Sequence, residues 1–448
     1  MKKILITLSL LLAFTEYSSA QIIHRNPTIE KMVQEISTDN LEKNIHGLVS
    51  FGTRHSLSED QESRGIEAAR HYVLEQFQSF IPASEGRLSA KIDYFTIEAD
   101  GRRIPEDVTM GNVMATLKGT DPEDNRVIIV SGHLDSRVSE IMDAEQDAPG
   151  ANDDGSGVVA LIEMARIMSK NPLSATVIFV AVSGEEQGLK GAAHLAQRAK
   201  EENWNLIAML NNDMIGNSAS SGTLLRDNTR VRVFSEGVPL NETEEMKKLR
   251  QYTNGENDSK SRQLARYIKE VGERYVDQLE IKLIYRNDRF LRGGDHTPFS
   301  REGFTAIRMC EFNENYHQQH QDLRTEEGVI YGDTPEHIDY EYLRKNTAAN
   351  LATLASLAMS PSVPQEVGID VSELSNSSKL QWKAPKNGQA KGYYILMRET
   401  SAAMWEKKFY TTETTYTLPY SKDNYFFAVQ AVGEGMTESL PVFPAPAR

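Results

Sequence analysis

Cysteine is almost absent from this 448-residue chain, because Cys310 is the only one. A disulfide within the chain is therefore excluded, and so is a metal site that needs several thiolate ligands. Any metal centre in this protein must be built from histidine, aspartate and glutamate side chains.

Long apolar runs are missing after the first residues. The run at residues 4–14 is too short to span a bilayer, and no later stretch has the roughly 20 apolar residues of a membrane helix. Lys2 and Lys3 precede this run and small residues follow it at 18–20, as in a secretory signal peptide. We therefore predict a signal peptide at residues 1–20, a mature chain that begins near Gln21, and a secreted or periplasmic protein without an integral membrane segment.

An excess of positive charge is missing as well. Lysine and arginine number 49 against 64 aspartates and glutamates, so the net charge is −15. Nucleic acids and anionic lipids are bound through clustered basic side chains, so this balance argues against a nucleic-acid partner. The 39% of hydrophobic residues still allows a large buried core, and the length exceeds that of a typical single domain.

The apolar pattern predicts an α/β fold for residues 21–360, with a mixed, largely parallel central sheet flanked by helices. Residues 22–87 have helical periodicity, which changes to that of paired strands at residues 91–98 and 111–117. Continuous apolar runs are typical of strands buried on both faces, and they occur at residues 127–131, 176–182 and 207–210. Further strands are predicted at residues 281–285 and 305–309, and helices at residues 157–169 and 344–359.

The pattern changes again after Pro361, which ends the last predicted helix. Short alternating segments separated by Asn, Gly and Pro follow at residues 367–371, 378–382, 392–398, 415–418 and 425–432. Such segments predict a small all-β sandwich at residues 361–448, with Trp382, Tyr393 and the stretch 425–427 in its core. The tail resembles a fibronectin type III module, and we expect it to act as a spacer or to bind a surface or partner.

Histidine and acidic residues follow three consecutive buried strands and fill the loop before the predicted helix at 157–169. They are His133 and Asp135, Asp153 and Asp154, Glu185 and Glu186, and Asp213. Because the carboxyl ends of parallel strands meet at one edge of a sheet, we expect these side chains to lie together there. Carboxylates gathered in this way repel one another unless cations lie between them. The pattern therefore predicts a metal centre.

The chemistry of each side chain suggests its role in such a centre. The imidazole of His133 can bind a metal, and Asp135 can accept a hydrogen bond from the other ring N–H and so orient the ring. Asp153 has two oxygens and can bridge two metals. Of Glu185 and Glu186, one can bind a metal while the other faces the bound water as general base.

The donor set also indicates which metal is bound. Asp213 can bind the other metal. Zinc suits a site of imidazole and carboxylate donors without thiolates, and cobalt or manganese could replace it. Each motif has a structural interpretation when it stands alone, since Asp153 or Asp154 can cap the following helix and a His-x-Asp pair can be a simple hydrogen-bonded pair. All four motifs in order at strand ends favour the metal centre.

Four of these segments resemble, in order and spacing, the motifs of the co-catalytic di-zinc peptidase family. They are GHLDS at 132–136, PGANDDGSG at 149–157, SGEEQGLKGA at 183–192 and NNDMIG at 211–216. That family includes bacterial leucine aminopeptidases, plasma glutamate carboxypeptidase and glutaminyl cyclases, and the likeness extends over about residues 40–360. The resemblance implies two zinc ions and peptide substrates. It also implies His133 and Asp213 on one zinc, Asp153 bridging, Glu186 on the second zinc and Glu185 as the base.

The last metal ligand is where this chain departs from the family pattern. The family has a histidine followed four residues later by an acidic residue, but Gln318 stands four residues before Asp322 here. Either His317 or His320 must then bind the metal; we favour His320 and keep His317 open. Tyr316 is the candidate for a hydrogen bond to the tetrahedral oxyanion.

A later family element appears as GDHTPF at residues 294–299. It is expected either to support the site or face the substrate, or to form a turn that Pro298 ends.

The sequence therefore predicts a secreted zinc exopeptidase, with aminopeptidase action as the first expectation. A carboxypeptidase or dipeptidase with the same metals is the first alternative, a glutaminyl cyclase the second, and a non-catalytic surface-binding module the third. The resembling cyclases use one zinc and depart from the acidic pair that Asp153 and Asp154 keep here. The intact Glu185 argues against a non-catalytic module.

Overall fold

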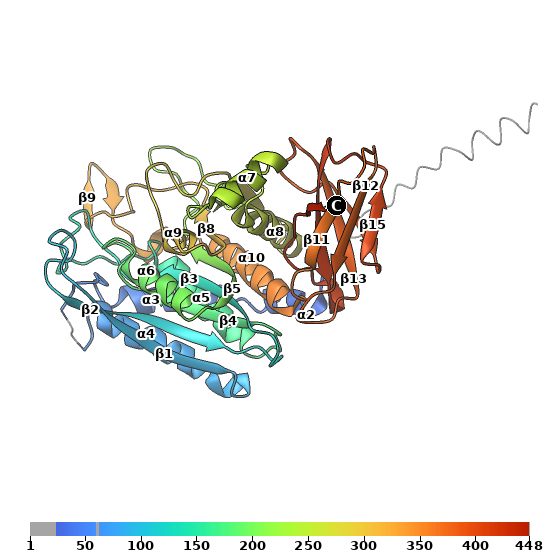
Figure 1. Cartoon of the computed structure of the whole chain (residues 1–448). Helices are drawn as coiled ribbons and strands as arrows, with labels where there is room; N and C mark the ends of the chain where they lie inside the picture. The colour runs from blue at the N-terminus through green and yellow to red at the C-terminus, as the bar shows by residue number, and fades with distance from the viewer. Residues whose placement is uncertain (1–23, 60–61, 448) are drawn as a thin grey trace, which may run out of the picture.

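The computed structural model describes residues 24–59 and 62–447 (Figure 1). The predicted signal peptide at 1–20 lies outside the described residues. The first described helices are α2 (Pro27–Gln34), α3 (Thr38–Val49) and α4 (Gly65–Ser79). The side chains of Asn26 and Ser37 accept hydrogen bonds from the first-turn N–H groups of α2 and α3. The helical periodicity predicted for residues 22–87 is confirmed for these three segments, whereas residues 50–59 and 62–64 form turns and loops instead of a helix. Within the described residues, no helix has both the length and the apolar character needed to cross a membrane.

The centre of the molecule is an eight-stranded sheet with the order β1-β2-β4-β3-β5-β8-β6-β7. Its strands are β1 (Leu88–Ile97), β2 (Val108–Leu117), β3 (Arg126–His133), β4 (Thr176–Val182), β5 (Asn205–Asn212), β6 (Arg230–Phe234), β7 (Glu280–Ile284) and β8 (Ala306–Glu311). The four middle strands, β4, β3, β5 and β8, are parallel, whereas β2 and β6 pair with them in the antiparallel direction. The predicted mixed and largely parallel sheet is confirmed.

Strand β6 is not among the strands predicted from the sequence. Its sequence, RVRVF, alternates arginine with apolar residues and lacks the continuous apolar run that marked the central strands. Arg232 of β6 instead forms an ion pair with Glu314 at 2.6 Å. Glu314, which is distant in the sequence, thus compensates the charge of Arg232 within the sheet. The local sequence pattern around β6 does not reveal this partner.

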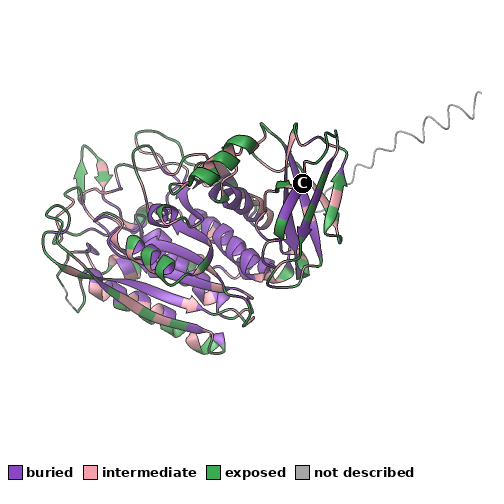
Figure 2. Cartoon of the chain, viewed as in Figure 1, coloured by how far each residue is buried: buried purple, intermediate pink, exposed green. Residues whose placement is uncertain are grey.

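Helices cover both faces of the sheet, as α5 (Gly155–Met168), α6 (Lys190–Glu201), α8 (Lys260–Tyr275), α9 (His296–Arg301) and α10 (Tyr340–Met359). Successive residues of β3 enter different cores, because side chains alternate along a strand. Ile128 and Val130 pack in the core that contains α5 and α10, whereas Ile129 packs in the core that contains α6 and Phe299 of α9. Figure 2 shows the central strands and α10 almost entirely buried. This double burial explains the continuous apolar runs. A further helix, α7 (Glu244–Thr253), has no buried residue.

Residues after α10 form two small sheets that share one core. One sheet has the order β15-β12-β11-β17 and the other β14-β13-β16. The strands are β11 (Gln365–Asp370), β12 (Ser378–Lys383), β13 (Gly392–Glu399), β14 (Lys407–Thr411), β15 (Thr415–Leu418), β16 (Tyr425–Val432) and β17 (Ala445–Ala447). Trp382, Tyr393 and Phe427 are buried between the sheets as predicted, while Tyr425 and Phe426 are only partly buried. The fibronectin type III resemblance remains a prediction.

The small sheets pack beside α8 through buried ion pairs (Figure 1). Asp258, just before α8, lies 2.6 Å from a guanidinium nitrogen of Arg398 in β13 and 2.9 Å from one of Arg266 in α8. Arg274 of α8 lies 2.8 Å from a carboxylate oxygen of Glu438. These side chains are at most 9% exposed. The contact is therefore an ordered interface and not a loose tether.

Candidate metal centre

The predicted site lies at one edge of the central sheet, where the parallel strands β3, β4 and β5 end. His133 is the last residue of β3, and the loops after β4 and β5 carry Glu185, Glu186 and Asp213. Asp153 lies in the loop directly before α5. The structure thus brings together side chains that are far apart in the sequence, at the edge where the strand pattern placed them.

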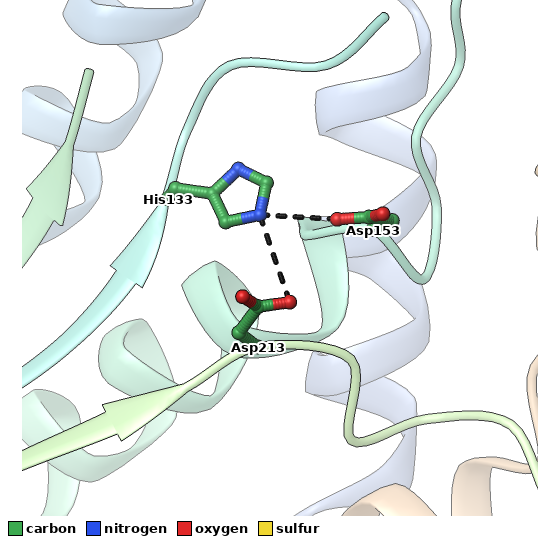
Figure 3. Close-up of side chains that lie close together, drawn as sticks. All are labelled: His133, Asp153 and Asp213. Atoms are coloured by element: carbon green, nitrogen blue, oxygen red, sulfur yellow. Dashed lines mark ion pairs between the residues drawn. The ribbon is translucent and has the colours of Figure 1, made fainter. Parts of the chain in front are cut away.

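The first group of metal-binding side chains is His133, Asp153 and Asp213, whose ligand atoms all lie within 4.8 Å of one another. Nε2 of His133 is 3.0 Å from Oδ1 of Asp153 and 3.8 Å from Oδ1 of Asp213 (Figure 3). Burial alone would lower the pKa of His133, but the two aspartates raise it well above its usual value. These carboxylates therefore require positive charge between them, and a divalent cation can supply it.

The second group is Asp153, Glu186 and His320, again with all ligand atoms within 4.8 Å. Nε2 of His320 is 2.7 Å from Oε1 of Glu186 and 3.0 Å from Oδ2 of Asp153. Burial opposes protonation of His320, but these two carboxylates raise its pKa to about 9. Asp153 belongs to both groups and turns Oδ1 toward one histidine and Oδ2 toward the other. It lies where a bridging carboxylate would have to lie.

The two groups fit two zinc ions in the number and kind of their donors. Together they offer three carboxylates and two imidazoles, and the shared Asp153 can serve both ions. Each ion would then have three protein donors, which leaves coordination room for a water molecule. Imidazole nitrogen and carboxylate oxygen are ligands that zinc accepts readily.

His320 joins the site and His317 does not. The ring of His317 packs against that of Tyr331, with ring centroids 5.2 Å apart, and its backbone N–H donates to Oδ1 of Asn315. His320 takes a left-handed backbone conformation with φ 56°, which few residues other than glycine adopt outside special sites. The sequence left both histidines open, and the geometry favours His320.

Known proteins resemble this chain over most of its length. The sequence profile of peptidase family M28 matches residues 112–353. A relative named as a probable zinc metalloprotease from Leptosphaeria maculans is 43% identical over 420 residues, which cover 93% of this chain and 97% of that protein. The chain belongs to peptidase family M28. It is therefore a peptidase, and so a hydrolase. Another probable zinc metalloprotease, from Pyricularia oryzae, is 40% identical and covers 96% of this chain and 86% of its own length.

Solved structures share the fold of this M28 peptidase. LapB from Legionella pneumophila aligns with a TM-score of 0.52 at 17% identity, over 78% of this chain and 80% of that chain. An aminopeptidase from Aneurinibacillus aligns with a TM-score of 0.51 at 16% identity, over 74% of this chain and 96% of that chain. At such identities the likeness concerns the fold alone.

Asp135 supports the M28 centre in a different way from the one predicted. Nδ1 of His133 is 2.9 Å from the main-chain carbonyl of Asp135, whereas the nearer carboxylate oxygen is 3.9 Å away. The carboxylate instead accepts hydrogen bonds from the backbone N–H groups of Glu185 and Glu186, at 3.2 and 3.0 Å. The side chain turns toward the loop after β4 because unpaired N–H groups are available there. Asp135 therefore positions both glutamates, and its backbone orients the histidine.

Glu185 and Glu186 face different surroundings. Glu186 is 6% exposed and belongs to the second donor group. Glu185 is partly exposed and lines a cavity of about 320 Å³ together with metal-binding residues of both groups. Burial and the charges of Glu186 and Asp213 raise the pKa of Glu185 well above its usual value, against the effect of His133. Glu186 is thus placed to hold a metal, and Glu185 is placed to face the space that a substrate would enter.

Tyr316 lies away from the centre. Its side chain is 57% exposed, and it is not among the described residues that line the metal cavity. Its backbone N–H donates to Oγ of Ser221. Tyr316 directly precedes His317, which also lies outside both donor groups. This placement gives the predicted oxyanion role no support.

Asp154 connects three parts of the centre. Its Oδ1 accepts hydrogen bonds from the N–H groups of Gly157 in α5 and Met214 after β5, and its Oδ2 accepts one from the N–H of His133. The cap that the sequence allowed for Asp153 or Asp154 is therefore made by Asp154, leaving the Asp153 carboxylate free for metal. The peptide bond between the two aspartates is cis.

Other supporting residues were missed because they come from distant segments. Asp333 accepts the N–H groups of Asn152 and Asp153, the latter at 2.7 Å. Arg54 donates to the main-chain carbonyls of Leu134 and Gly150. No local motif marks them. Among the other polar partners of the donors are Arg137, Arg308 and Gln319.

The GDHTPF element forms the start of α9 behind the cavity. Asp295 and His296 are both buried, and Nε2 of His296 is 2.8 Å from the main-chain carbonyl of Asn287. Burial raises the pKa of Asp295 to about 8. Neither residue lines the metal cavity among the described residues, whereas Thr297 of the same element lines a neighbouring cavity of about 600 Å³, and the element begins a helix rather than a simple turn.

Proposed function

We propose that this M28 peptidase is a zinc-dependent exopeptidase that works with two zinc ions. The observation that carries the proposal is the position of Asp153, whose two carboxylate oxygens each face one histidine of a separate donor group. Its relatives named as probable zinc metalloproteases support zinc as the metal. The predicted signal peptide at residues 1–20 supports a secreted or periplasmic location as part of the same proposal.

The residues around this site can divide the work of amide hydrolysis. When bound, the two zinc ions lower the pKa of a water molecule and polarise the scissile carbonyl. Glu185 faces the cavity, so its carboxylate can accept the proton of the water and pass it to the leaving amine. Asp135 fixes the backbone of Glu185 through a hydrogen bond, which limits how far this base can move.

Aminopeptidase action is the first form of the proposal, as the sequence predicted. Carboxypeptidase or dipeptidase action at the same centre is the second, and one observation favours it: four arginines line the cavity with the metal-binding residues. A glutaminyl cyclase receives less support, because the structure offers donor groups for two ions.

Reporter peptides test the proposal directly. Aminoacyl and carboxyl-terminal reporters are assayed side by side with the zinc-loaded protein, before and after dialysis against a chelator. We expect cleavage of a terminal residue that stops on chelation and returns with zinc. Cleavage that survives complete metal removal, or cleavage only in the middle of long peptides, would contradict the proposal.

A further inference from the structure

Arginine is concentrated at the metal cavity although the chain as a whole is acidic. The cavity of about 320 Å³ is lined by Arg103, Arg137, Arg289 and Arg292 as well as by the metal-binding side chains. The chain carries a net charge of −15, so composition alone does not lead one to expect four guanidinium groups around one small space. Whether each arginine can bind a substrate group depends on whether a carboxylate of the protein already neutralises it.

Two of the four arginines already have carboxylate partners. Nε of Arg137 is 2.9 Å from Oε2 of Glu186, and Nη1 of Arg289 is 2.8 Å from Oε2 of Glu314. These ion pairs belong to the walls of the cavity, and the carboxylates largely neutralise the charges of Arg137 and Arg289.

The other two arginines have no carboxylate partner within the described part of the chain. Arg103, in the loop between β1 and β2, donates from Nη1 to the main-chain carbonyl of Glu186 at 2.6 Å. Arg292, in the loop before α9, has no side-chain hydrogen bond or ion pair to the described residues. Both side chains are exposed at the mouth of the cavity. Two positive charges thus face the entry without compensation from the protein.

The acidic residues of the cavity leave nothing to bind a positively charged substrate group. The lining carboxylates are Asp153, Glu185, Glu186 and Asp213. Three of them belong to the donor groups and the fourth is the proposed base. Every lining carboxylate thus already has a role in metal binding or in the proposed chemistry, whereas Arg103 and Arg292 have no carboxylate partner among the described residues.

A second cavity of about 600 Å³ continues the same surface. It shares Leu189, Arg292 and Gly293 with the metal cavity. It adds Arg301 of α9, which is exposed and has no ion pair within the described residues. Arg292 thus stands where the two cavities meet. Arg292 and the proposed base Glu185 line the same cavity.

From this arrangement we infer that the site recognises a carboxylate of its peptide substrate through Arg103 and Arg292; the inference rests on the proposed peptidase function. A guanidinium binds a carboxylate through two parallel, charge-assisted hydrogen bonds. The carboxylate is either the C-terminal group of a short peptide or the side chain of an aspartate or glutamate beside the cleaved bond. Both sources present the same chemistry to the two arginines.

Four dipeptides distinguish these sources, because their single peptide bond is the cleaved bond in either direction of attack: Ala-Glu, its C-terminal amide, Ala-Gln and the amide of that peptide. With zinc-loaded protein we expect kcat/KM to fall about 10–100-fold, through KM, when the recognised carboxylate is removed, because a charge-assisted hydrogen bond is lost. A loss on amidation alone assigns the C-terminal group, and a loss on exchange of Glu for Gln alone assigns the side chain.

Arginine variants connect the preference to the named residues. Arg103→Ala and Arg292→Ala should each raise KM by about 10-fold or more for the preferred peptide and change it little for the peptide without the carboxylate. Arg292→Lys should recover part of the loss. The matched control is Arg102→Ala, because Arg102 is the exposed neighbour of Arg103 and does not line the cavity.

Binding measurements separate a failure of this inference from a failure of the proposed function. Calorimetry with the zinc-loaded Glu185→Gln protein compares the affinities of the four peptides without cleavage. Equal affinity for all four, or an equal loss with all four in the arginine variants, overturns the carboxylate inference even if peptides are cleaved. Selective binding without any cleavage by the zinc-loaded wild-type protein keeps the inference and overturns the proposed peptidase chemistry.

Discussion

Nη2 of Arg308 forms an ion pair of 2.9 Å with Oδ1 of Asp213, a member of the first donor group. Nη1 of the same guanidinium lies 3.0 Å from Oδ1 of Asp288, and all three side chains are at most 3% exposed. Burial alone would raise the pKa of Asp213, but Arg308 lowers it to about 2. One buried cation thus keeps Asp213, a donor of the metal centre, and Asp288 ionised.

The first prediction concerns the stability that this arginine provides. Arg308→Met keeps much of the volume but leaves Asp213 and Asp288 as buried charges, so the free energy of unfolding of the metal-free protein should fall by about 3–5 kcal/mol. Urea unfolding measures the loss. Arg301→Met, at an exposed position of α9, is the control and should change stability by less than about 0.5 kcal/mol. A loss below about 1 kcal/mol for Arg308→Met would contradict the assignment.

The same pair predicts a pH dependence. Asp213 has a lower pKa in the folded protein, about 2, than in the unfolded chain, so its stabilisation is complete above about pH 4 and is lost as pH falls toward 2. The Arg308→Met variant lacks this contribution. The stability difference between the two proteins should therefore shrink below about pH 4, which urea titrations at several pH values would reveal.

The second prediction concerns the metal count. The wild-type protein should bind near two zinc ions per chain. His320→Ala should retain one of them firmly, because the variant loses a ligand of the second donor group and keeps the first group intact. His317→Ala is the matched control, because His317 lies three residues away and outside both groups. Elemental analysis after dialysis gives the counts. A single zinc at saturation in the wild type would contradict the two-ion proposal and favour a cyclase.

Most of the donor set could be predicted because His133, Glu186 and Asp213 lie within a few residues of the ends of parallel strands, while Asp153 directly precedes α5. The apolar run of β3 leads directly to His133, and that of β5 leads to Asp213. Once the strands are known to be parallel and adjacent, their ends must meet, and the donors with them. Sequence and structure therefore agree where local pattern and sheet topology determine the position.

The residues that support the donors, and the choice of the last histidine, depend on contacts between distant segments. Asp333 holds the loop of Asp153 from 180 residues away, and nothing in its own neighbourhood indicates a site. Arg308 gave a signal that could have been used: an arginine inside a buried strand needs a buried anion as partner. The choice between His317 and His320 depends on the backbone path of one loop, which residue spacing alone does not determine.

The third prediction concerns the C-terminal sheets. None of their described residues lines the metal cavity. A chain shortened at Ser360 that folds should therefore keep the kcat of the full chain on a small substrate. It should also lose several kcal/mol of stability, because Arg274 loses its buried partner Glu438. Glu438→Gln in the full chain removes the same charge without removing the sheets and should show a smaller loss. A folded, zinc-loaded short chain without turnover would show that the sheets shape the site.

The last prediction distinguishes Glu185 from its neighbour Glu186. Glu185→Gln keeps the shape of the side chain and both donor groups but removes the proton acceptor, so kcat should fall by about 10²–10⁴-fold or more while zinc content and KM change little. Glu186→Gln replaces a charged donor of the second group, so zinc occupancy should fall and activity should partly return with excess zinc. Each variant is the control for the other, since both remove one carboxylate from adjacent positions. Steady-state kinetics with elemental analysis of the same samples gives both readouts. A Glu185→Gln protein that loses zinc and recovers with added zinc reverses the two roles, and one that keeps full activity excludes Glu185 as the base.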